Sequence, residues 1–111
     1  MALRVVQPGV GERRLLVIAY FIADTVDLLE ALPKAACVLE DIDDGNGRFA
    51  RPPDAGGVDP IESALGLART HAGDFEPSAT LLIAWSAGCQ APRELLRAGA
   101  RPEGILALDG V

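Results

Sequence analysis

The chain has 111 residues, of which 50% are hydrophobic and 23% are charged, and these values are typical of one globular domain and not of a disordered segment. Its formal net charge of −6 disfavours non-specific nucleic-acid binding, and no basic patch with interleaved aromatic residues opposes that conclusion. The longest apolar run, Leu15 to Ala23, is too short to cross a bilayer, and the segment Met1 to Pro8 lacks the apolar core of a signal peptide. We therefore expect a single α/β domain over residues 1–111, located in the cytoplasm and without a membrane span.

The sequence carries no signature of a cofactor or a metal. Cys37 and Cys89 are the only cysteines, and their wide separation matches no zinc or redox spacing. There is no Gly-x-Gly-x-x-Gly after a predicted strand and no phosphate-binding P-loop. We therefore interpret the cysteines as buried free thiols and expect neither a cofactor nor a metal site.

Short apolar runs alternate with helical patterns in the first part of the chain. Leu3–Val6 is a candidate edge strand, and Leu15–Tyr20 reads as a strand buried on both faces. Asp24 suits the N-cap of a helix that ends at Pro33. Ala35–Leu39 is predicted to be a second buried strand.

A long loop follows, running from Glu40 to Val58, with its glycines and prolines concentrated in residues 41–58. Long loops in small domains are often functional lids. The run that starts at Asp41 resembles a calcium loop, but Gly45 and Pro52 fall where oxygen ligands are required. We interpret the run as a solvated turn cluster within a loop that could cover a ligand site as a lid.

The clearest helix signal follows this loop. Asp59 suits the N-cap, Pro60 the first helical position and Glu62 the capping box, and Gly73 ends the helix. Its apolar stripe predicts that one face packs against a sheet.

The last part of the chain repeats the strand and helix alternation. Thr80–Trp85 is predicted to be a third buried strand, and Ile105–Leu108 a fourth. The intervening helix is clearest over Arg93–Ala98 and is followed by Gly99. Pro92 is expected to kink this helix or to delay its regular start.

Strands separated by helices predict right-handed crossovers and a mostly parallel sheet of about four or five strands with helices on both faces, a three-layer α/β/α arrangement. In such a sheet the loops that follow the strands emerge at the carboxyl edge, where ligands bind. The topology is expected to gather Tyr20 to Ala23, the long loop from Glu40, Ser86 and Asp109 at that edge.

The residues around Ser86 carry the strongest functional signal. Ala84 and Gly88 place small side chains two positions before and two positions after Ser86, as close packing of a strand against the following helix requires. This pattern resembles the nucleophile elbow of the α/β-hydrolase superfamily, Gly-x-Ser-x-Gly, with Ala84 in place of the first glycine. The resemblance covers the N-terminal and central part of that fold, through the elbow and the strand after it.

The resemblance implies a serine hydrolase-like domain that acts on a small-molecule ester or other acyl substrate. Ser86 would attack the carbonyl carbon, and the backbone N–H groups of Ala87 and Phe21 would form the oxyanion hole. Asp109, at the end of the last predicted strand, would be the acid that orients a catalytic histidine, although an Asp-Gly pair is also common in turns. Tyr20 and Trp85 would contact the substrate beside the elbow.

The proton acceptor is the missing part of this interpretation. His71 is the only histidine and none follows Ser86. His71 falls close to the apolar stripe of its helix, so we interpret it as a packed or half-exposed structural residue. The base is expected from outside these residues, either from a missing C-terminal part or from a second chain, or the chain has none.

A second interpretation comes from a different functional class. Serine is a frequent helix N-cap, and Ser86 suits that role as well. The chain would then be a non-catalytic α/β binding or interaction module, whose degenerate elbow holds a small molecule or a partner at the carboxyl edge. An exposed flank of the sheet would favour self-association.

Overall fold

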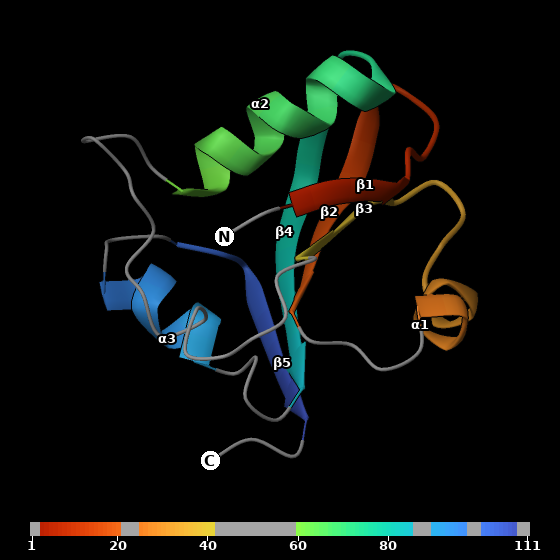
Figure 1. Ribbon diagram of the computed structural model, residues 1–111. Helices are drawn as coiled ribbons and strands as arrows, with labels where there is room; N and C mark the ends of the chain where they lie inside the picture. Colours follow the sequence, from red (N-terminus) through yellow and green to blue (C-terminus); the bar gives the residue numbers. More distant parts are fainter. Residues whose placement is uncertain (1–2, 21–24, 42–59, 86–89, 98–100, 109–111) are drawn as a thin grey trace.

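The computed structural model describes residues 3–20, 25–41, 60–85, 90–97 and 101–108 (Figure 1). Within these ranges the chain forms an α/β fold with a five-stranded mixed sheet. The elements in chain order are β1 (Leu3–Gln7), β2 (Arg13–Tyr20), α1 (Thr25–Ala31), β3 (Cys37–Asp41), α2 (Pro60–Ala72), β4 (Glu76–Trp85), α3 (Gln90–Arg97) and β5 (Gly104–Leu108).

The strand order of the sheet is β1-β3-β2-β4-β5. Strands β2, β3, β4 and β5 are parallel to one another, and β1 pairs with β3 in the antiparallel direction. The chain first adds β3 on one side of β2 and then returns through α2 to add β4 on the other side. The space between the ends of β2 and β4 is therefore a topological switch point, the place where open α/β sheets bind ligands.

Alternating side chains of the central strands pack against different helices. Ile18 of β2 and Leu82 of β4 pack with Ala64 of α2 and Leu95 of α3. Val17 of β2 lies in the cluster that includes Leu28, Leu29 and Leu32 at α1, so the opposite face of the sheet packs there. Figure 1 shows α1 and α3 on different sides of the strands.

The parallel strands are longer than their apolar runs. Strands β2 and β4 begin at Arg13 and Glu76, which pair with each other, because backbone pairing continues beyond the buried segment. Strand β3 runs to Asp41, so the prediction that the loop begins at Glu40 is wrong. Glu40 and Asp41 continue the strand because β1 pairs with them on one side and β2 on the other. Residues 42–58 of the predicted lid lie outside the described residues.

Helix α2 confirms the predicted positions of Pro60 and Gly73, and helix α3 corrects one prediction, whereas the predicted N-caps Asp24 and Asp59 lie outside the described residues. Helix α2 begins at Pro60, and Gly73 follows its last residue with φ +86° and donates its N–H to the Arg69 carbonyl at 3.1 Å. Helix α3 begins at Gln90, ahead of Pro92, and not after it. Pro92 therefore lies in the first helical turn. Backbone N–H groups in this turn have no intrahelical acceptor, so the absence of an N–H on proline costs no hydrogen bond there, and Pro92 does not delay the helix.

The two edge strands of the sheet, β1 and β5, differ in the features that protect a strand from pairing with a further strand. On β1, Arg4 pairs with Glu40 at 3.2 Å, and the register shifts between Val5 and Gln7. Charges and bulges of this kind protect a sheet edge from further pairing. On β5, the consecutive residues Ile105 and Leu106 are exposed, so apolar side chains project from both of its faces.

Candidate functional site

The four parallel strands end at a common carboxyl edge. Tyr20, the last residue of β2, pairs with Asp41, the last residue of β3, and with Ala84 near the end of β4. Trp85, the last residue of β4, pairs with Leu108, the last residue of β5. The structure therefore brings Tyr20 and the Ala84–Trp85 pair together at the switch point.

Most of the predicted catalytic residues follow these strand ends directly in the chain. Phe21 follows Tyr20 after β2, Ser86 and Ala87 follow Trp85 after β4, and Asp109 follows Leu108 after β5. Ser86, Ala87, Phe21 and Asp109 themselves lie outside the described residues. The described structure thus defines the strand ends from which these residues leave the sheet.

Tyr20 is enclosed in the core at this edge. Its side chain is 1% exposed and packs in a cluster with Ala84 and Leu95. Burial raises the pKa of the Tyr20 phenol far above its usual value, and the negative charge of Asp41 raises it further. The phenol is therefore protonated at neutral pH. Direct contact between the Tyr20 ring and a substrate, as the sequence predicts, requires that the residues covering the ring move.

Asp41 is a buried carboxylic acid at the same edge, with 5% of its surface exposed. The interpretation of Asp41 as part of a solvated turn cluster is therefore wrong. Its position beside Tyr20, at the end of a strand buried by its neighbours, encloses it. The signal in the sequence was an acidic residue at the end of an apolar run in a predicted parallel sheet, where strand ends meet ligands.

Trp85 and Tyr20 project from opposite faces of the sheet. Side chains alternate along β4, so Trp85 shares the face of Ile83, which packs with Val17. Tyr20 shares the face of Ala84. Trp85 is 41% exposed. The two residues predicted to contact the substrate therefore lie on opposite faces of the sheet and do not line the same side of a binding site.

His71 lies at the other end of the parallel strands. It belongs to the last turn of α2 and borders an open hollow with Leu3, Arg4, Val5 and Pro8. The following strand, β4, has ten residues, which corresponds to roughly 30 Å between its two ends at about 3.3 Å per residue. His71 is exposed and not packed in the core, and the length of β4 separates it from the strand end that Ser86 follows, which excludes it as a base for Ser86.

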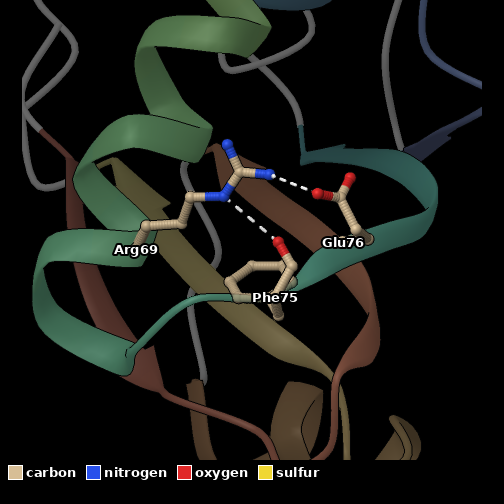
Figure 2. A network of polar contacts seen from close by, with 3 residues as sticks. All are labelled: Arg69, Phe75 and Glu76. Carbon is tan, nitrogen blue, oxygen red and sulfur yellow. Dashed lines mark hydrogen bonds and ion pairs between the residues drawn. The ribbon is translucent and has the colours of Figure 1, made fainter.

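The amino ends of the strands hold a network of arginine contacts (Figure 2). Arg69 Nε donates a hydrogen bond to the Phe75 carbonyl at 3.1 Å, and Arg69 Nη2 lies 3.4 Å from Glu76 Oε1. Arg14 lies over the Phe75 ring at 4.8 Å and donates to the Ala72 carbonyl at 2.9 Å. Because these guanidinium groups bind backbone carbonyls, they stabilise the turn between α2 and β4.

The described residues contain no group of three or more His, Cys, Asp or Glu side chains that could hold a metal ion. Cys37 of β3 is a buried free thiol, as predicted, and burial raises its pKa while Arg14 has the smaller, opposite effect. A thiol of raised pKa is a poor nucleophile. Cys89 lies outside the described residues.

In the part of the chain that the structure describes, no helix has the length and apolar character needed to span a membrane.

Comparison of the chain with protein-family models, with curated proteins and with solved structures finds no match.

Proposed function

We propose that the carboxyl edge between β2 and β4 is the active site of a serine hydrolase-like domain, with Ser86 as the nucleophile toward an ester or other acyl bond. The observation that carries the proposal is the position of Ser86 in the chain, directly after β4, at the topological switch point. Phe21, which would supply the second oxyanion N–H, directly follows the neighbouring strand β2.

The spacing between β4 and α3 supports an elbow at this position. Strand β4 ends at Trp85 and α3 begins at Gln90, so the chain passes from strand to helix within a few residues, as a nucleophile elbow does. Ala84 is completely buried and packs with Tyr20 and Leu95. The elbow pattern requires a small side chain at this position, and the packing supplies the physical reason.

The proposal includes the three-layer α/β/α arrangement of the α/β-hydrolase type. The contacts of α1 with one face, and of α2 and α3 with the other, support it. The order strand, helix, strand, helix, strand, helix, strand from β2 to β5 also follows the order that the resemblance implies.

In the proposed chemistry, the Ser86 hydroxyl oxygen attacks the carbonyl carbon and the acyl group passes to serine as the leaving group departs. The Ala87 and Phe21 N–H groups would donate hydrogen bonds to the oxyanion. His71 is too distant to accept the serine proton, so the base is a group other than the histidine of this chain. Asp109, directly after β5, would orient that base from the next strand along the edge.

The same edge could instead bind a ligand without catalysis. The position of the only histidine at the opposite end of the sheet favours this alternative. In that case the chain is a binding or interaction module, and the exposed Ile105 and Leu106 of β5 offer a surface for self-association.

Labelling with an uncharged fluorophosphonate separates the two functions. We expect one equivalent of phosphonyl group on Ser86, detected by intact-protein and peptide mass spectrometry. Ser86→Ala should abolish labelling, whereas Ser78→Ala, at an exposed serine near the start of β4, should leave it unchanged. A well-folded parent that is not labelled would contradict the hydrolase proposal and favour the binding module.

A further inference from the structure

Strand β5 is an edge of the sheet. In the part of the chain that the structure describes, it pairs with β4 and with no other strand. Its five residues, Gly-Ile-Leu-Ala-Leu, carry no charge. The open side of an edge strand presents backbone N–H and C=O groups to which a further strand can bind.

Exposed apolar side chains gather around this edge. Six large hydrophobic side chains are well exposed among the described residues, and four of them lie at the end of β4, in α3 or in β5. These four, Trp85, Leu96, Ile105 and Leu106, are 41% to 46% exposed. Apolar side chains that cluster on a surface mark an interaction site more often than single ones do.

The apolar side chains of β5 project from both faces of the sheet. Ile105 pairs with Leu82, which packs on the face of α2 and α3, and Leu106 pairs with Ile83, which packs on the face of α1. A partner that docks on one face covers only one of these side chains. A strand added to the edge contacts both, because its own side chains alternate between the two faces. The occupant that fits is therefore a further strand.

The other edge of the sheet is a poor source of that strand. On β1, Arg4 pairs with Glu40, and the register shifts between Val5 and Gln7. Such charges and bulges oppose the addition of β1 of one copy to β5 of another, which would also leave open ends and build a filament. Pairing of β5 with β5 about a two-fold axis uses the same surface on both copies and closes as a dimer.

The residues of β5 suit pairing with themselves. A two-fold axis makes the two strands antiparallel, and all five residues overlap when the central residue, Leu106, lies opposite Leu106 of the second copy. No charged side chains of the strand then oppose each other. The Glu103 carboxylate, just before β5, accepts a hydrogen bond from the Thr80 N–H of β4 at 2.6 Å, so it is held toward its own sheet.

We propose that β5 is an interaction surface whose partner is β5 of a second copy of this chain, so that the two sheets join into one continuous sheet. This inference goes beyond the proposed function, because it concerns assembly and requires no reaction of Ser86.

Light scattering and sedimentation velocity over a concentration series test the dimer. Leu106→Lys places two like charges opposite each other at the two-fold axis, and Ile105→Lys places charges on the other face. We expect either variant to raise the dissociation constant of the dimer by more than about tenfold. Val26→Lys, at a 64% exposed valine of α1, is the matched control and should leave the constant unchanged. Circular dichroism verifies folding.

Cross-linking tests the register. Directly opposite residues of antiparallel strands have Cα atoms about 4.5–5.5 Å apart, so a short bismaleimide should join two copies of Leu106→Cys. Val26→Cys should not be joined. Both variants are made together with Cys89→Ser, and Cys37 is buried.

A folded parent that stays monomeric at every concentration at which it is soluble overturns the proposal and leaves the edge to a strand of a different protein. Growth beyond a dimer overturns the closed two-fold arrangement. A dimer that Leu106→Lys and Ile105→Lys leave unchanged, or that is not cross-linked at Leu106→Cys, overturns β5 as the interface. Should the lysine variants not fold, the cross-link decides. None of these results depends on fluorophosphonate labelling, so failure of this inference and failure of the proposed function are distinguishable.

Discussion

The two ends of the parallel strands use their polar residues differently. At the amino end, Arg14 and Arg69 donate hydrogen bonds to backbone carbonyls and close the turn before β4. At the carboxyl end, Tyr20 and Asp41 are buried side by side, and the charge of one raises the pKa of the other. Burying a charged group costs free energy. The arginine contacts at the amino end therefore stabilise the fold, whereas the carboxyl end encloses a phenol and a carboxyl group whose desolvation costs free energy.

Arg14→Ala should give the largest loss of stability. The substitution removes the hydrogen bonds from the guanidinium to the carbonyls of Ala72, Pro8 and Gly11, each at 2.9 Å, and its contact with the Phe75 ring. We expect the free energy of unfolding to fall by about 3 kcal/mol, measured by urea denaturation. Labelling of the folded protein should not change. Arg13→Ala, at the exposed neighbouring arginine, is the control and should cost less than about 0.5 kcal/mol.

Ala84→Leu should affect both stability and function. Ala84 is completely buried between the strands and the helices, and the additional side-chain volume should lower the free energy of unfolding by about 2 kcal/mol. Fluorophosphonate labelling should be lost in the protein that remains folded. Ala84→Gly, which restores the usual elbow glycine, should retain labelling. Full labelling of folded Ala84→Leu would contradict the elbow.

Arg69→Ala tests whether the amino end contributes to stability alone. Its guanidinium donates to the Phe75 carbonyl and pairs with Glu76 (Figure 2). We expect a loss of about 1 kcal/mol in the free energy of unfolding, because the carbonyl is only partly buried. The labelling rate should be unchanged. A lower labelling rate in folded Arg69→Ala would show that the two ends of the sheet are coupled.

Glu76→Gln should have the smallest effect. The Glu76 side chain is 77% exposed, and an exposed ion pair of this kind contributes less than about 0.5 kcal/mol. Urea denaturation at low and at high salt should give nearly the same midpoint for the variant and the parent. A loss greater than about 1 kcal/mol would show that the ion pair, and not the arginine-to-carbonyl bonds, stabilises this turn.

Several elements could be predicted because their signals are local. The run Leu15–Tyr20 predicted a buried central strand, and Pro60 with Gly73 predicted the bounds of α2. Strand and helix ends were less predictable where polar residues continue a regular element, as Asp41 does in β3. Pro92 was misjudged because a proline in the first turn of a helix and a proline that interrupts one differ only in where the helix begins.

The sequence by itself determined the α/β class, the mostly parallel sheet and the position of Ser86 directly after a buried strand, because apolar periodicity and capping depend on neighbouring residues. Only the tertiary structure decided the strand order, and thus the switch point between β2 and β4. It also decided that Asp41 is buried beside Tyr20, that Trp85 and Tyr20 project from opposite faces, and that His71 lies at the far end of the sheet. Each of these depends on contacts between residues distant in the chain, which local patterns do not encode.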